Sequence, residues 1–414
     1  MVVTRIVGRC CGPAVKYVRT ASTSASVKPT CLTDLHVRLG AKFAPFAGFK
    51  MPTVYEDMSI FESTLHVRKH TGIFDVSHML QTMITGQDCI PFIESLTCVN
   101  LKVKDGRSSL TVFLNEQGGI KDDLIVSRLA PDRLYVVTNA GCIDKDVAHM
   151  QTHLSEWQNK GKDVQVQHMH GHGLLAVQGP EAIRVVQSGT PDLDLSQLFF
   201  MHTTTATVFG VPNCRVTRCG YTGEDGCEIS VPADRAVELC EKLLKSNESR
   251  VKMVGLGARD ALRLEAGLCL YGNDMNEATT IVQADLTWLL GKRRREAADF
   301  PGAAVTLQQL ANRQQWLEER VRVGFLSTTG RPPRAGSTLI TQGSGHEAGT
   351  VTSGCPAPSL AAGTNIGMAY VKAKHAKSGT RLDAVVGRSK TSVEVVPMPF
   401  VPTKYYVQLK KKKM

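Results

Sequence analysis

The sequence predicts an α+β protein of two or three domains, and three observations support this fold class. The chain has 414 residues, more than one ordinary domain holds. Up to about residue 290, short strand pairs alternate with short amphipathic helices. After the basic run 292–295, Gly- and Pro-rich strands with few helical patterns continue to Tyr406, which predicts a small β-barrel or sandwich.

The composition is that of an ordinary soluble globular protein. Hydrophobic residues make up 42% and charged residues 21%, so the chain has enough apolar surface to offset the entropy of ordering it. No apolar run approaches the roughly 18 residues of a membrane-spanning helix. The composition therefore excludes disorder as the main state, and we expect no membrane span.

The net charge of +11 is concentrated at the two ends of the chain. Residues 1–30 contain five basic residues and no acid, and the segment after residue 403 contains five more. The body between them is nearly neutral, which is a poor electrostatic footprint for nucleic acid. We therefore expect no nucleic-acid partner.

The first thirty residues are typical of a targeting segment. They are basic, rich in Ser, Thr, Ala and Val, and lack the continuous apolar region of a secretory signal. This composition predicts a mitochondrial transit peptide over 1–30; a disordered basic arm is the alternative. The last residues, 407–414, are interpreted as a basic tail.

The first strands and helices follow from hydrophobic periodicity. Residues 111–114 and 120–127 read as a hairpin around a Gly-Gly turn, and 134–137 as the next strand. Apolar residues recur at helical spacing from Ile143 to Trp157, which predicts a helix with one apolar face.

A second set of elements is predicted between residues 173 and 290. Residues 180–187 should form a short helix with Pro at its start. Residues 214–218 and 227–231 should form strands joined by a Gly-rich turn. Helices are expected at 233–245 and 258–270.

Common cofactor and metal motifs are weak in this chain. Gly171-x-Gly173-x-x-Ala176 resembles a dinucleotide fingerprint, but the pattern continues as a strand instead of opening a helix. His168, His170 and His172 alternate as metal ligands on one strand face could, but no Cys or acid cluster accompanies them. We favour partly exposed strand histidines. The twelve cysteines form no CxxC pair, which predicts reduced and mostly buried thiols.

Three charged residues stand out because of their positions in the predicted strands and helices. Asp123 alternates with Leu124, and Glu228 lies between two apolar residues, so a strand would turn each acid toward the face opposite its neighbours. An acid on an inner face is costly unless it meets a ligand or a donor. Turn chemistry at Asp123 and a solvent-facing Glu228 are the alternatives. Arg259 shares a helix face with Arg263, where a surface ion-pair stripe is the alternative to a binding role.

Several motifs in sequence order resemble the T-protein family of the glycine cleavage system, which are aminomethyltransferases. The resemblance covers about residues 32–406, and it rests on Phe46-Ala47-Gly48, Phe74-Asp75-Val76-Ser77-His78-Met79, Asn115-Glu116, Gly118-Gly119-Ile120, Asp122-Asp123-Leu124, Arg218 through Glu228, Gly257-Ala258-Arg259-Asp260 through Tyr271-Gly272-Asn273-Asp274, and Thr352-Ser353-Gly354.

The resemblance implies a three-domain cloverleaf around a central folate cavity. Two mixed α/β domains with antiparallel sheets would precede a C-terminal β-barrel or jelly-roll domain. The implied boundaries are 31–78 with 173–290 for a discontinuous folate-binding domain, 79–172 for a ferredoxin-like domain, and 296–406 for the barrel.

The resemblance also implies the reaction. The family transfers the methylene carbon of an aminomethyl group from the dihydrolipoyl arm of the H-protein to tetrahydrofolate. The products are ammonia and 5,10-methylenetetrahydrofolate. Tetrahydrofolate is the co-substrate, no metal or flavin is needed, and the H-protein is the partner. With the leader, the resemblance implies the mitochondrial matrix.

Site residues carry over from the matching positions. Asp123 is the expected catalytic acid, which would orient the folate amine and stabilise positive charge at the transferred carbon. Glu228 is expected to accept two adjacent N–H donors of the pterin. Arg259 would fix ligand and acid orientation.

Four further positions match the folate pocket of the family. Tyr405 matches a folate-contacting position, Met79 and Asn139 match lining positions, and Tyr221 would supply an aromatic wall.

A non-catalytic folate-binding relative acting in iron–sulfur protein assembly is the alternative function. A folate-dependent demethylating oxidase is a third possibility, but it would need an attached flavin domain, for which we expect no room beside the leader.

Three features depart from or add to the family pattern. Phe49 stands where Trp is usual. Ile281 and Gln283 replace the usual Pro and Glu after Thr280, and are expected to alter a loop beside the folate cavity. The basic run 292–295 could dock an acidic carrier by electrostatic steering or form a solvated interdomain face.

Overall fold

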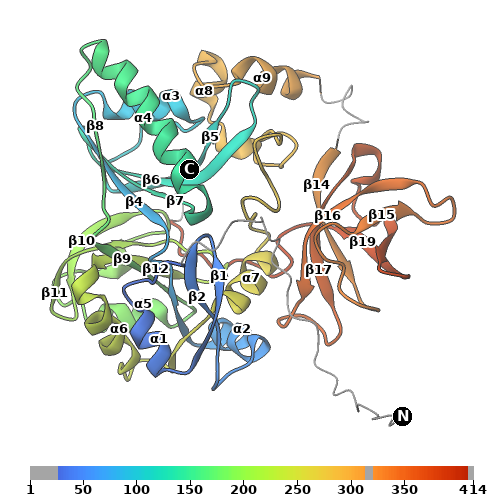
Figure 1. Ribbon diagram of the computed structural model, residues 1–414, viewed down its shortest axis with the longest axis horizontal. Coiled ribbons are helices and arrows are strands. Elements are labelled where there is room, and N and C mark those ends of the chain that lie inside the picture. The colour runs from blue at the N-terminus through green and yellow to red at the C-terminus, as the bar shows by residue number, and fades with distance from the viewer. Residues whose placement is uncertain (1–26, 313–319, 409–414) are drawn as a thin grey trace, which may run out of the picture.

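The computed structural model describes residues 27–312 and 320–408, and these residues form three lobes (Figure 1). Two lobes are each built around an antiparallel-rich sheet with helices, and the third is a closed six-stranded barrel. The predicted α+β class with a C-terminal barrel is therefore confirmed. Nearly all of the predicted leader, and most of the predicted tail, lie outside the described residues.

The first lobe contains a six-stranded sheet in the order β10-β11-β12-β9-β3-β13. Only the β13–β3 pair is parallel. The strands are β3 (Thr71–Asp75), β9 (His172–Gln178), β10 (Thr203–Val208), β11 (Val211–Thr217), β12 (Gly226–Pro232) and β13 (Val251–Met253). The helices around it are α1 (Thr33–Arg38), α2 (Ile60–Lys69), α5 (Ala182–Ser188), α6 (Ala236–Leu244) and α7 (Leu256–Glu265), with a separate hairpin of β1 (Ala41–Phe46) and β2 (Phe49–Tyr55).

Side-chain alternation gives this sheet two different faces. On β9, Leu175 and Val177 pack into a core that includes α5 and α6. Leu174 and Ala176 point the other way, into a cluster shared with the second lobe. The six-stranded sheet is therefore apolar on both sides, and one side faces the second lobe.

The second lobe contains a five-stranded sheet in the order β5-β6-β7-β4-β8. Its elements are β4 (Leu80–Thr85), α3 (Cys89–Leu96), β5 (Arg107–Leu114), β6 (Ile120–Ala130), β7 (Arg133–Thr138), α4 (Ile143–Asn159) and β8 (Gln165–His168). Met150 and Leu154 of α4 pack against Leu124 of β6, which confirms the predicted amphipathic helix. Tyr135 and Val137 of β7 face the first lobe.

The segment after β13 differs from the prediction in two places. Helix α7 ends at Glu265 instead of Leu270, because Gly267 adopts a left-handed conformation with φ of 72° and stops the helix. Residues beyond 290 contain two helices that the sequence pattern did not indicate, α8 (Lys292–Ala297) and α9 (Ala303–Ala311). Phe300 and Ala303 pack with β5 and β6, so this segment belongs with the five-stranded sheet.

The barrel closes in the order β14-β17-β16-β15-β18-β19. Its strands are β14 (Arg320–Ser327), β15 (Thr338–Thr341), β16 (Glu347–Pro356), β17 (Asn365–Lys372), β18 (Arg381–Val386) and β19 (Ser389–Val396). Because the strands begin at Arg320, we propose this residue, and not 296, as the start of the barrel domain. For the other two domains we propose the boundaries implied by the resemblance, except that the packing of Ile281, Phe300 and Ala303 adds the segment 275–312 to the second domain.

Helix α7 connects the barrel to the rest of the molecule. Arg263 is 1% exposed and forms an ion pair with Asp274 at 2.6 Å. Its Nη2 also donates to Ser353 Oγ of the barrel at 2.8 Å. Along the described chain, no helix has both the length and the apolar character required to cross a membrane.

Candidate functional site

A small pocket lies between the facing sides of the two larger sheets. The five-stranded sheet contributes polar and apolar side chains from β6 and β7, and the six-stranded sheet contributes side chains from β9, β11 and β12. The pocket is lined by Ile125, Ser127, Tyr135, Val137, Leu174, Arg215, Thr217, Cys219, Glu228 and Ser230. Only one of these residues, Glu228, carries a carboxylate.

Glu228 faces the pocket because of the alternation along β12. Its neighbours Cys227 and Ile229 pack into the opposite core, so Glu228 and Ser230 turn toward the five-stranded sheet. The side chain is buried, at 8% exposed. Burial raises the pKa of Glu228, while the charge of Arg259 and a hydrogen bond from the Cys219 thiol lower it. A solvent-facing position for Glu228 is therefore wrong.

Arg259 lies in the first turns of α7 with its guanidinium over the ring of Tyr221, 4.8 Å from the ring centre. Its Nη1 is buried and has no hydrogen-bond partner among the residues that the structure describes. Burial lowers the pKa of Arg259, and the charge of Glu228 opposes that effect. A surface ion-pair stripe is wrong for this helix face, because Arg263 is the buried residue that holds the barrel.

Asp123 lies near the start of β6, beyond the turn at Gly118 and Gly119. Asn139 Nδ2, at the end of β7, donates to Asp123 Oδ1 at 2.8 Å and to Asp122 Oδ1 at 3.0 Å. Burial and then the charge of Asp122 raise the pKa of Asp123 to about 7, while the Asn139 hydrogen bond lowers it. A carboxyl with this pKa can either hold or accept a proton near neutral pH.

Tyr221 lies close enough to both Asp123 and Arg259 for their charges to act on it. Its hydroxyl donates to the carbonyl oxygen of Cys269. Burial is the main cause of its raised pKa, and the charges of Asp123 and Arg259 both act on it. The structure thus brings Asp123, Asn139, Tyr221, Arg259 and Glu228 into one region between the sheets.

Tyr405 and Met79 lie around this region. The ring of Tyr405 stacks on Phe200 with centres 4.1 Å apart, and burial raises the pKa of Tyr405 to about 12. The charge of Arg68 opposes that increase, whereas Cys219, which lines the pocket together with Glu228, contributes to it. Met79 packs in the apolar cluster with Val137 between the sheets.

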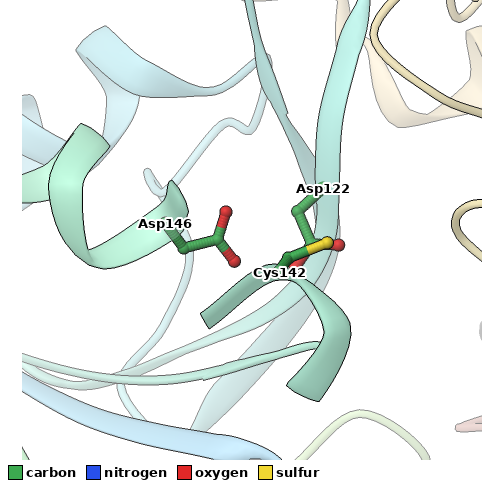
Figure 2. Close-up of side chains that lie close together, drawn as sticks. All are labelled: Asp122, Cys142 and Asp146. Carbon is green, nitrogen blue, oxygen red and sulfur yellow. The ribbon is translucent and has the colours of Figure 1, made fainter. Parts of the chain in front are cut away.

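Two further buried groups lie beside the site, and the sequence analysis assigned no role to either of them. His78 lies edge-on to the rings of Phe46 and Phe49, and burial lowers its pKa to about 4. Asp122, Cys142 and Asp146 have their polar atoms within 4.8 Å of one another (Figure 2). Among the described residues this is the one group of three with the spacing to share a cation. No sequence spacing pointed to it, because its members come from a strand, a turn and a helix.

The three alternating histidines do not form such a group. His168 bonds with the Thr82 hydroxyl at 3.0 Å at the end of β8, and His172 begins β9. His170 lies in the turn between these two strands, so the three histidines are partly exposed as expected but do not share one strand face. The ten cysteines in the described chain form no disulfide, and all but Cys31 and Cys269 are buried, as predicted.

The basic run 292–295 is partly internal. Arg294 is 1% exposed and donates to the carbonyl oxygens of Glu94 and Thr97. Arg293 bonds to the Glu94 carboxylate at 2.5 Å. These contacts disagree with both expectations for the run. The four residues together form neither a docking surface nor a fully solvated face.

The replacements after Thr280 are accommodated locally. Ile281 is fully buried in the core beside β5 and β6. Gln283 Oε1 accepts the backbone N–H of Thr280 at 3.0 Å, a role that a glutamate oxygen fills equally well.

Two family models match the chain. The model described as the GCVT N-terminal domain matches residues 32–294, and the model described as the glycine cleavage T-protein C-terminal barrel domain matches residues 320–402. Together they cover the two sheet-containing lobes and the barrel.

Curated relatives match over nearly their whole length. The mitochondrial aminomethyltransferase of Gallus gallus is 50% identical over 398 residues, which are 96% of this chain and 98% of the relative. That of Homo sapiens is 50% identical over 381 residues, 92% of this chain and 91% of the relative. The solved structure of glycine cleavage system aminomethyltransferase T from Bartonella henselae is 39% identical, with a TM-score of 0.83 over 92% of this chain and 100% of its own.

Proposed function

Because the chain belongs to the glycine cleavage T-protein family, we propose that it is a mitochondrial aminomethyltransferase. It transfers the methylene carbon of an aminomethyl group, carried on the dihydrolipoyl arm of the H-protein, to tetrahydrofolate. A non-catalytic role in iron–sulfur protein assembly has no support in these relatives, which are named aminomethyltransferases.

The site assignment rests on two acids that lie in the region between the sheets. Glu228 has a buried carboxylate, and the pKa of Asp123 is raised to about 7. The 2-amino group and N3 of a pterin present two adjacent N–H donors, and the Glu228 carboxylate can accept both in a planar pair. The free donor of Arg259 would then meet an acceptor of the ligand or the Glu228 carboxylate itself. Tyr221 and Tyr405 would flank the folate with aromatic rings.

Asp123 is proposed as the catalytic residue at the transfer end of the folate. The reaction breaks the bonds from the methylene carbon to sulfur and to the amino nitrogen, and forms two bonds to folate nitrogens. The two folate N–H protons end on the leaving ammonia and on the dihydrolipoyl sulfur. With a pKa of about 7, Asp123 can accept one of these protons and, when ionised, stabilise positive charge at the carbon.

Asn139 and Met79 complete the proposal. Asn139 would hold the Asp123 carboxyl through its 2.8 Å hydrogen bond, and Met79 would pack against the ring system. Tetrahydrofolate is a substrate of the family, and the H-protein is the partner of its members. This reaction scheme requires no metal and no flavin.

The test is ammonia release in the presence of tetrahydrofolate and aminomethyl-loaded H-protein, with Asp123→Asn run in parallel. Wild-type protein should release ammonia only when folate is present, and Asp123→Asn should be slower by about 10²- to 10³-fold. Folate binding with no turnover in the wild-type protein would contradict the enzyme assignment. Equal rates for the two proteins would contradict the role of Asp123 alone.

A further inference from the structure

Two acids lie behind the proposed catalytic residue, and in the described part of the chain neither forms an ion pair. Asp122 on β6 and Asp146 in the first turn of α4 are both 0% exposed. Figure 2 shows the Asp146 carboxyl directed toward Asp122 and Cys142. Two ionised carboxylates in such a place repel each other and lose their hydration, so the arrangement requires a neutralising partner.

The two carboxyls differ in their hydrogen bonds. Asp122 Oδ2 accepts the backbone N–H of Asn139 at 3.0 Å, and Asp122 Oδ1 accepts the Asn139 side-chain amide at 3.0 Å. Both oxygens of Asp146 are buried, and neither has a hydrogen-bond partner among the described residues. Asp122 therefore has ordered donors, whereas the Thr138 hydroxyl beside Asp146 lowers the pKa of Asp146 but forms no regular hydrogen bond with it in the described chain.

The groups around Asp146 include one cation, Lys145, whose charge lowers the pKa of Asp146 but is outweighed by burial and the charge of Asp122. They are Asp122 from β6, Thr138 from β7, Cys142 from the turn before α4, and Lys145 from α4 itself. The Lys145 ammonium donates to the Tyr271 hydroxyl at 2.6 Å and to Glu277 Oε1 at 3.1 Å, away from the pair. Burial and the charge of Asp122 raise the pKa of Cys142, so this group stays a neutral thiol.

We propose that Asp146 is a protonated positioning residue, which donates its carboxyl proton to Asp122 and thereby fixes Asn139 against Asp123. Asp122 and Asp146 together then carry one negative charge instead of two. The Asp146 oxygen that holds the proton donates it to an oxygen of Asp122. Burial, and after it the charge of Asp122, raise the pKa of Asp146 to about 10, in agreement with this arrangement. The inference rests on the proposed role of Asp123.

The consequence for Asp123 is both geometric and electrostatic. Asn139 Nδ2 is the shared donor of Asp122 and Asp123, so an ordered Asp122 fixes the amide that orients the catalytic carboxyl. A single charge on the pair also sets how far the pKa of Asp123 is raised, because Asp122 is the charged neighbour that raises it.

The test compares Asp146→Asn with Asp146→Ala in the aminomethyl-transfer assay across pH. Asp146→Asn keeps an N–H donor without charge, so the acidic limb of the pH–rate profile should stay within about 0.3 pH units of wild type. Asp146→Ala removes the donor, so kcat should fall by about 10- to 100-fold with KM for tetrahydrofolate changed less than about threefold. Asp146→Asn should recover most of that loss.

Asp122→Asn is the matched variant for the charge. This variant removes the one negative charge of the pair, which raises the pKa of Asp123 in the wild-type protein. The acidic limb of the pH–rate profile should therefore move to lower pH. If Asp146 were ionised in the wild-type protein, Asp146→Asn would also remove a charge and would move the limb in the same direction. That shift in Asp146→Asn would overturn the proposal.

A readout independent of activity is the infrared carbonyl band of a protonated carboxylic acid. At about pH 8.5 Asp123 is mostly ionised, so a band present in wild type and lost in Asp146→Asn identifies the proton on Asp146. Absence of the band, or stoichiometric metal in purified protein that is lost in Asp146→Asn, would overturn the proposal. If the wild-type protein showed no aminomethyl transfer, the proposed function would fail while the band still decided the state of the pair.

Discussion

Replacing Asp123 by Asn should make the protein more stable while making it nearly inactive. The surroundings raise the pKa of Asp123 from its ordinary value of 3.8 to about 7. In the unfolded chain the carboxyl ionises near its ordinary value, so between these two pH values the folded state binds the proton more tightly. Stability therefore falls as pH rises through this window, and above it the ionised group costs on the order of 4 kcal/mol.

Asn has the same shape as Asp, and its Oδ1 can still accept from Asn139. The stability gain of Asp123→Asn should thus be close to zero at about pH 4 and reach roughly 2–4 kcal/mol at about pH 8. Urea unfolding of both proteins at these two pH values measures it, with Asp192→Asn, a change at an exposed carboxylate, as the matched control. A gain that is the same at both pH values, or that is larger at low pH, would refute the reasoning.

The other predictions concern binding, stability and sequence departures. Glu228→Gln keeps one acceptor but loses the charge, so KM for tetrahydrofolate should rise by about 10- to 100-fold with a smaller change in kcat; an unchanged KM in steady-state assays would remove Glu228 from the pterin site. Arg263→Met leaves Asp274 buried without its cation, so urea unfolding should show a loss of about 3–5 kcal/mol, part of which Asp274→Asn should restore; equal stability of Arg263→Met and wild type would count against the pairing. Gln283→Glu should change kcat by less than about twofold, because either side chain caps Thr280 N–H, and a large gain in activity would show that the glutamine impairs the loop.

Local patterns in the sequence predicted the positions of the two proposed site carboxylates. Leu124 packs with α3 and α4, and Asp123 turns to the opposite side, as the alternation along a strand requires. Cys227 and Ile229 likewise enter the core under α5 and α6, which leaves Glu228 facing the pocket. In both cases a period of two indicated which way the acid turns, but it did not show whether solvent or a second sheet would lie on that side.

The partners of these residues could not be predicted from spacing. Asp146 stands in the first turn of a helix, where an acid is ordinarily a solvated residue that favours the helix dipole. It is buried because α4 covers the five-stranded sheet over Asp122, a contact that no local pattern encodes. The burial of Arg263 and Arg294 depends in the same way on partners far along the chain, in the barrel and in α3.

The order of strands in the six-stranded sheet also constrains how the chain folds. Strand β3 pairs with β9, and the whole five-stranded sheet lies in the chain between them. Ser77 Oγ donates to Leu174 O across a sequence separation of 97 residues. Joining such distant segments is entropically unfavourable until the intervening chain has become compact. We therefore expect the inserted sheet to collapse first, and the surface that carries Glu228 to meet the surface that carries Asp123 only in the last slow phase. Pulse-labelled hydrogen exchange would then show protection of the backbone amides of β6 and β7 before those of β9 and β12. The five-stranded sheet would thus be stable well before the binding site between the two sheets has formed.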